Sequence, residues 1–160
     1  MPSRQKSRQR ALQILYLIDM RSEGDVSTAE AIRSYFLSLG DEEGEPVHEE
    51  DDFAEQLVKG SIENKREIDR IIVAHSQHWR IERMAVVDRN ILRLASFEML
   101  KLATPPPVVI DQALELAGKF SSPESLSFLN GVLDAIHHEL FNGPPPVSPP
   151  RASEPPPAES

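Results

Sequence analysis

The stretch PVVIDQALELAGKFSSPESLSFLNGVLDAIHHEL, residues 107–140, contains two helical patterns joined by a short serine-proline segment. The first pattern has the i, i+3, i+4, i+7 spacing of one buried helix face, at Ile110, Ala113, Leu114 and Ala117. The second has a similar apolar stripe, at Leu129, Val132, Leu133, Ile136 and Leu140. Two amphipathic helices in succession need other elements to cover their apolar faces, so this stretch organises the rest of the chain.

The joining segment FSSPES, residues 120–125, has the chemistry of a helix start. Ser121 or Ser122 can accept a hydrogen bond from an unpaired amide, and Pro123 fits the first turn, where its missing N–H costs nothing. Glu124 stands three residues after Ser121, as in a capping box. Gly131 lies inside the second helix at a cost of about 1 kcal/mol relative to alanine, so we expect another backbone to pack closely against it.

Helical periodicity continues through most of the remaining chain. It predicts one helix from Arg8, a second from Ser27 to Gly40, and a third after residue 52 with a break near Asn64. The apolar face of residues 84–102 is broad enough for a central helix, which the prolines at 105–107 end. On its polar face we expect solvated ion pairs among Asp88, Arg89 and Arg93. The chain is therefore predicted to be all-α.

Charge is distributed unevenly along this chain, whose net charge is −9. The segment of residues 41–52 carries eight of the acidic residues and should form a solvated loop, whose last residues suit the negative first turn of the following helix. It lacks the spacing of a calcium loop, so we expect no metal there. His75 and His78 could share a metal at i, i+3, but partly exposed helix residues are the favoured interpretation. We expect no cofactor.

The first ten residues concentrate positive charge, with four basic side chains at Arg4, Lys6, Arg8 and Arg10. Cations oppose the helix dipole at an N-terminus, so stability does not explain this placement. One interpretation is a contact with RNA phosphates; the alternative is a solvated, frayed terminus. Tyr16 follows two turns after Arg8 and could stack on a base, or could be a half-buried core residue.

Composition excludes several classes of protein. The absence of cysteine rules out disulfides, thiolate metal sites and cysteine nucleophiles, and is compatible with a reducing cytoplasm. The N-terminal segment lacks the apolar region of a signal peptide, and no run reaches membrane-spanning length, so we expect no membrane association. Trp79 should lie in a turn, although it could also be an interface anchor. The tail at 143–160 has eight prolines and should be disordered.

Three segments resemble the signature blocks of the NusB transcription antitermination family. They are ALQILYLID at 11–19, DRNILRLASFEML at 88–100 and VVIDQALELAGKFSSPESLSFLNGVLD at 108–134, in the order and approximate spacing typical of that family. The resemblance covers about residues 8–136. It implies a compact fold of about seven helices in two small bundles, spanning residues 1–142 with the acidic loop at 41–52, and no catalysis.

The resemblance also implies a function. Members of this family bind the boxA element of nascent, single-stranded RNA together with the ribosomal protein NusE, in a complex that lets RNA polymerase pass terminators. By position, Arg8 and Arg10 match the family's arginine-rich start and Tyr16 its following tyrosine. The resemblance assigns further positions to the RNA and NusE surface: Phe120, Glu124 and Phe128, with Glu82 and Asp88 on the partner side.

Two departures from the family pattern remove positive charge. The start RQKSRQR alternates its cations with polar residues, and Gly118 replaces a common lysine. We therefore expect weak RNA affinity from the isolated protein, with NusE supplying much of the binding. Family members differ in homodimerisation, and the sequence leaves that open.

The resemblance implies that this protein is a non-enzymatic RNA-binding adaptor, and two other functions are alternatives to it. An RNA cytosine methyltransferase is disfavoured, because no methyl-donor fold follows and no cysteine can act as nucleophile. A helical protein-interaction module without direct RNA binding is the remaining alternative.

Overall fold

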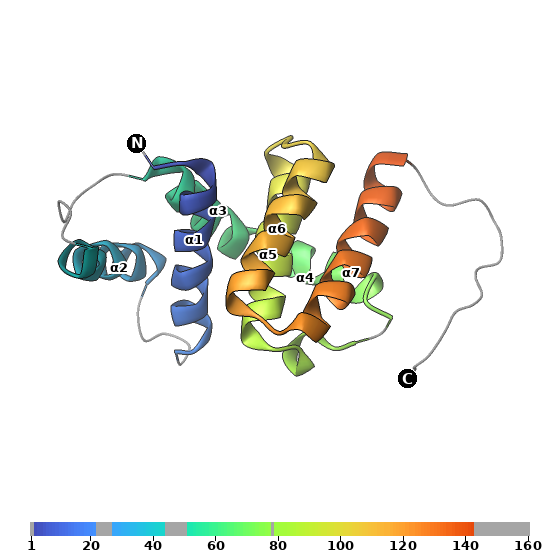
Figure 1. Cartoon of the computed structure of the whole chain (residues 1–160), viewed down its shortest axis with the longest axis horizontal. Helices are drawn as coiled ribbons and strands as arrows, with labels where there is room; N and C mark the ends of the chain where they lie inside the picture. Colours follow the sequence, from blue (N-terminus) through green and yellow to red (C-terminus); the bar gives the residue numbers. More distant parts are fainter. Residues whose placement is uncertain (1, 22–26, 44–50, 78, 143–160) are drawn as a thin grey trace. The chain divides into compact units, whose positions relative to one another are not determined.

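The computed structural model describes residues 2–21, 27–43, 51–77 and 79–142. All regular elements in these ranges are helical, which confirms the predicted all-α class. The helices are α1 (Arg4–Asp19), α2 (Thr28–Glu43), α3 (Asp52–Glu63), α4 (Lys65–Ala74), the short 3₁₀ helix η1 (Ile81–Arg83), α5 (Val86–Lys101), α6 (Pro106–Phe120) and α7 (Pro123–Asn142) (Figure 1). They form two compact units, Met1–Glu63 and Asn64–Ser160.

The first unit packs α1 against both α2 and α3. Its core is built from the apolar faces that periodicity predicted, and the fully buried members include Ala11, Ile14, Ala54, Leu57 and Val58. Ser27 caps α2 as a capping box, because the Glu30 N–H donates to Ser27 Oγ at 3.1 Å and the Ser27 N–H donates to Glu30 Oε1. The helix continues past Gly40 to Glu43, so the expected end at Gly40 is wrong.

Helix α1 begins four residues earlier than the periodicity indicated. Ser3 is its N-cap, and Ser3 Oγ accepts a hydrogen bond from the Lys6 N–H at 3.0 Å. Arg4 and Lys6 therefore lie in a capped first turn, and the frayed-terminus alternative is wrong for this part of the chain.

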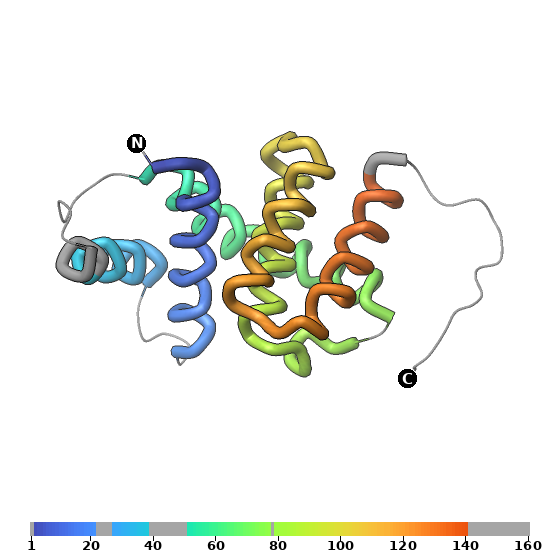
Figure 2. Tube along the Cα trace, viewed as in Figure 1, coloured from blue at the N-terminus to red at the C-terminus, as the bar shows by residue number. Residues whose placement is uncertain are grey.

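The second unit is organised around α5, as predicted. Every residue from Ile91 to Met99 is buried, and α4, α6 and α7 all pack on this helix. In Figure 2 the chain reverses direction between α5 and α6 and again between α6 and α7. The break near Asn64 is confirmed, because α3 ends at Glu63 and α4 begins at Lys65.

The polar face of α5 differs from the solvated ion-pair surface that we expected. Asp88 and Arg93 are each only 6% exposed. Arg93 Nε and Nη2 donate to the two carboxylate oxygens of Asp69 on α4, at 2.9 and 3.1 Å, and its Nη1 donates to Asn90 Oδ1. The two bonds to Asp69 link α5 to α4 and are partly buried, because α4 packs on the side of α5 that its sequence marks as polar.

The expectation of close packing at Gly131 is also wrong. Gly131 is exposed on α7, and a Cβ built there meets nothing within 4 Å. The glycine therefore reflects no steric demand within the described part of the chain.

Several sequence predictions fall outside the described residues. These are most of the acidic segment, at 44–50, the side chain of His78 and the proline-rich tail at 143–160. Within the described ranges, no helix is both long and apolar enough to cross a membrane. The same ranges hold no group of three or more His, Asp or Glu side chains that could bind a metal ion.

Candidate nucleic-acid interface

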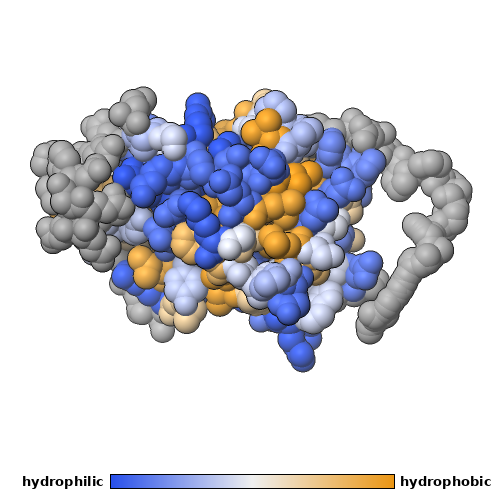
Figure 3. Space-filling view, in the orientation of Figure 1, coloured by the Kyte–Doolittle hydropathy of each residue, from blue (hydrophilic) through white to orange (hydrophobic). Residues whose placement is uncertain are grey.

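The four basic residues of α1 differ in exposure along the helix. Arg4 is exposed and Lys6 is half-buried, whereas Arg8 is 8% and Arg10 is 3% exposed. On the face shown in Figure 3, hydrophilic residues cover the N-terminal part of α1. Arg4 and Lys6 are therefore the cations of this helix that are best placed to meet a phosphate.

Phe53 of α3 supports two of these arginines. The guanidinium carbon of Arg4 lies 3.9 Å from the centroid of the Phe53 ring, and that of Arg8 lies 5.5 Å from it. A cation over an aromatic face is attracted by the ring quadrupole. This contact restrains Arg4 while the side chain stays exposed, which lowers the entropy that it would lose on binding.

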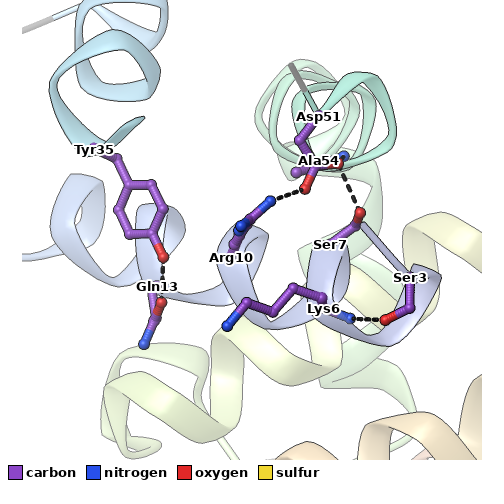
Figure 4. A network of polar contacts seen from close by, with 8 residues as sticks. All are labelled: Ser3, Lys6, Ser7, Arg10, Gln13, Tyr35, Asp51 and Ala54. Carbon is purple, nitrogen blue, oxygen red and sulfur yellow. Dashed lines mark hydrogen bonds and ion pairs between the residues drawn. The ribbon is translucent and has the colours of Figure 1, made fainter. Parts of the chain in front are cut away.

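Arg10 takes part in a buried network instead of facing solvent. Its Nη1 donates to Asp51 Oδ2 at 3.0 Å, and Ser7 Oγ donates to Asp51 Oδ1 at 2.6 Å (Figure 4). Asp51 Oδ1 also accepts the Ala54 N–H at 3.0 Å and so caps α3. Figure 4 shows Lys6 pointing away from this network. Direct phosphate contact by Arg10 stays a prediction, and it would require the guanidinium to leave its buried partner.

Sequence reasoning missed the role of Asp51. We expected Asp51 at the end of a solvated acidic segment, where it would complement the start of the next helix, yet its side chain is 1% exposed. The available signal was local, because an aspartate directly before the first turn of a helix is a favoured N-cap. The expectation fails at this residue because a cap that also pairs with a buried arginine must itself be buried.

Tyr16 lies on the exposed surface of α1, and its exposed fraction is 39%. Leu17 and Met20 are also exposed, at 38% and 58%. At this exposure the Tyr16 ring is partly buried and partly accessible, so its contact with a base stays a prediction. Its ring is available for contact with a base or with a protein partner.

The second unit brings together a different part of the predicted site. Glu124 is exposed at the start of α7, and Phe120 and Phe128 are half-buried. The Phe128 ring makes an edge-to-face contact with Trp79, with centroids 6.4 Å apart. Sequence reasoning noted Trp79 but did not connect it to Phe128, because residues 49 positions apart cannot be paired by periodicity.

Asp88 ties the hinge between α6 and α7 to α5. Its Oδ1 accepts from Ser121 Oγ at 2.5 Å, and its Oδ2 accepts from Ser125 Oγ at 2.6 Å. Ser121 therefore does not form the expected capping box with Glu124; instead, Ser125 N–H donates to the Ser122 carbonyl oxygen. The structure gives Asp88 a packing role, and its contact with a partner stays a prediction.

Glu82 is the exposed acidic residue of this region, in η1. A backbone hydrogen bond to its carboxylate and the neighbouring Arg80 guanidinium lower the pKa of Glu82 below its ordinary value. Arg80 Nη2 lies 3.1 Å from Glu82 Oε2. The carboxylate is therefore ionised at neutral pH and can accept from a basic partner.

A shallow hollow of about 650 Å³ lies between α6 and α7. Asp111 and Glu115 line it, together with Leu114, Leu126, Ser127 and Asn130. Because its charged residues are acidic, this surface repels a phosphate backbone. It is therefore a poor candidate for nucleic-acid contact.

Comparison with known proteins identifies the family of this chain. The NusB family model matches residues 5–138. The chain is 50% identical over 150 residues to the transcription antitermination protein NusB of Solibacter usitatus, covering 94% of this chain and 97% of that protein. It is 46% identical over 134 residues to the NusB of Anaeromyxobacter dehalogenans strain 2CP-1, covering 83% and 89%.

Solved structures share the fold. One of T. maritima NusB superposes with a TM-score of 0.73 at 28% identity, covering 86% of this chain and 92% of that one. A structure of NusB and NusE in complex with dsRNA has a TM-score of 0.69 at 29% identity, covering 84% and 95%. The match to the family model spans both helical units and includes all of the predicted site residues except Arg4. The chain therefore belongs to the NusB family of transcription antitermination proteins.

Proposed function

We propose that this protein is a non-enzymatic adaptor that binds single-stranded boxA RNA together with NusE. The proposed setting is the cytoplasm, in a complex with RNA polymerase that promotes antitermination, notably of ribosomal RNA operons. A relative in this family has been solved with both NusE and RNA, which supports the same pairing of partners here.

The observation that carries the proposal is the capped, basic first part of α1. Ser3 caps this helix and the Asp51 network ties it to α3; Arg4 is exposed on it, and Lys6 points away from the network (Figure 4). Exposed cations on a helix can neutralise phosphates and release their counterions. Tyr16, two to three turns further along the helix, supplies an aromatic face of the kind that stacks on unpaired bases.

Binding of labelled boxA-type RNA, measured by fluorescence anisotropy with and without NusE across a salt series, tests the proposal. The variant pair is Arg4→Ala/Lys6→Ala, because these side chains can be removed without breaking the buried network. We expect weak binding alone and tighter binding with NusE. The slope of log K against log salt should become shallower by about 1.4 in the double variant, at about 0.7 for each single-strand phosphate that is no longer neutralised.

Lys65→Ala/Arg66→Ala is the matched control, since it removes the same charge from exposed positions of α4. Equal reductions in affinity for the two double variants would indicate a general charge effect and not a site on α1. If the folded protein binds no RNA in either condition but still binds NusE, the protein-interaction module is the better account.

A further inference from the structure

Trp79 is the single tryptophan of the chain, and it lies 52% exposed in the turn after α4. One edge of its indole is fixed against the Phe128 ring of α7, at an interplanar angle of 67°. Removing a large aromatic side chain from water is energetically favourable. Its remaining exposed surface is therefore suited to covering by a ligand.

Hydrogen bonds fix the backbone that carries the indole. The Trp79 N–H donates to the Ser76 carbonyl oxygen at 3.1 Å, and Ser76 Oγ donates to the Trp79 carbonyl oxygen at 3.2 Å. Ser76 itself is 1% exposed. Gln77 adopts a left-handed φ of 56°, which closes the turn. Trp79 is therefore tied by two hydrogen bonds to a buried serine that follows α4.

Two exposed arginines follow Trp79 along the chain. Arg80 and Arg83 are both exposed and are three residues apart, across a turn in which the Arg83 N–H donates to the Arg80 carbonyl oxygen at 2.9 Å. Arg80 is the extended N-cap of η1, and Arg83 is the last residue of that helix. The ion pair of Arg80 with Glu82 is a surface pair, with both side chains more than 60% exposed, so a phosphate can compete for the guanidinium.

The surroundings favour a base over a protein partner. In the described part of the second unit, Val108 is the other large hydrophobic residue that is exposed, and it lies in the first turn of α6. A protein anchor is normally surrounded by further apolar contacts that exclude water. An exposed indole that is followed along the chain by two exposed arginines instead matches an aromatic platform for a base with phosphate contacts nearby.

We propose that Trp79, packed against Phe128 and followed along the chain by Arg80 and Arg83, stacks on one unpaired base of single-stranded RNA. The arginines contact the phosphates next to that base. This inference rests on the proposed function, since it adds a contact in the second unit to those of α1. It also assigns a chemical role to the contact between Trp79 and Phe128.

The native protein provides its own probe, because all indole emission comes from Trp79. Single-stranded boxA-type RNA carrying a terminal dye is titrated without NusE, and anisotropy and indole fluorescence are recorded in the same samples. We expect the emission to be quenched along the same binding curve as the anisotropy. A duplex of the same sequence has no unpaired base and should leave the emission unchanged.

Substitutions then measure the size of the contact. Trp79→Ala should weaken binding of single-stranded RNA by about 5- to 150-fold, the range for removal of one stacked base, and Trp79→Phe should recover part of it. Arg80→Gln/Arg83→Gln should make the salt slope shallower by about 1.4. Lys65→Gln/Arg66→Gln, in the first turn of α4, is the control and should retain tighter binding than the arginine pair.

The outcomes separate this site from the function on which it rests. Normal RNA binding without quenching, and with unchanged affinity in Trp79→Ala, overturns the stacking site and leaves the adaptor function intact. Failure of the folded native protein to bind RNA, with or without NusE, overturns both. A Trp79→Ala variant that loses NusE binding by calorimetry but keeps its RNA affinity overturns the base assignment in favour of a protein contact.

Discussion

Asp51 shows how much can depend on one carboxylate. It caps α3, accepts from Ser7 and pairs with Arg10, and both members of the ion pair are buried. Breaking a buried pair leaves the other charge without compensation, at a cost of about 3 to 5 kcal/mol. We therefore expect Asp51→Ala to lower the free energy of unfolding by about that amount, as measured by urea denaturation.

The neighbouring residue provides the control for this prediction. Asp52 carries the same charge but is exposed in the first turn of α3, so Asp52→Ala should change the free energy of unfolding by about 1 kcal/mol or less. Similar destabilisation of the two variants would show that the acidic charge matters and the buried network does not.

At Gly131 we predict a substitution that raises the free energy of unfolding instead of lowering it. Because a Cβ at this exposed helical position meets nothing, Gly131→Ala should raise the free energy of unfolding by up to about 1 kcal/mol. Gly118→Ala in α6 is a matched case, since a Cβ there also meets nothing within 4 Å. A lower melting temperature for Gly131→Ala would indicate a close contact at that face.

Among the helices of the second unit, Asp88 makes a polar link between α5 and the hinge that joins α6 to α7. Replacing Asp88 leaves the hydroxyls of Ser121 and Ser125 without their acceptor. We expect Asp88→Ala to destabilise the protein by about 1 to 3 kcal/mol, because partly buried donors are left unpaired. Asp111→Ala removes an exposed carboxylate of α6 and should have little effect on the denaturation midpoint.

The same variant distinguishes a packing role from a partner contact. If Asp88→Ala is as stable as the native protein but no longer binds NusE in calorimetry, the carboxylate acts on the partner and not on the hinge. Reduced stability with NusE affinity retained below the melting transition would support the packing role.

Helices were predictable from this sequence because apolar periodicity and helix-end residues are local signals. The buried face of α5, the break at Asn64 and the start of α2 at Ser27 all followed from them. Polar partners were not predictable. Arg10 and Asp51 are 41 positions apart, and Arg93 and Asp69 are 24 apart, so no local pattern indicates that they pair.

This distinction explains why the candidate site was only partly predictable. Sequence reasoning found the cations of α1, but it could not distinguish Arg4, which is exposed, from Arg10, which is buried in an ion pair with Asp51. It also treated Trp79 and Phe128 separately. Side chains on a charged or aromatic stretch divide between core and surface according to tertiary contacts, and periodicity does not contain that information.

At the scale of the whole molecule, the tail is the largest part without a predicted structural role. Residues 143–160 contain eight prolines and few residues that could be buried. We predict that a chain ending at Asn142 keeps its free energy of unfolding to within about 0.5 kcal/mol and keeps its RNA affinity. A lower denaturation midpoint or weaker anisotropy response in the shortened chain would contradict this prediction.

The pairing of Arg10 with Asp51 also has a consequence for synthesis on the ribosome. The arginine is made 41 residues before its aspartate, so at about 5 to 20 residues per second it waits roughly 2 to 8 seconds for that partner. Until α3 emerges, α1 has neither the carboxylate for Arg10 nor the Phe53 ring for Arg4. The basic surface of the first helix therefore matures only after the third helix has been translated, and a chain arrested between them presents the same cations without their final arrangement.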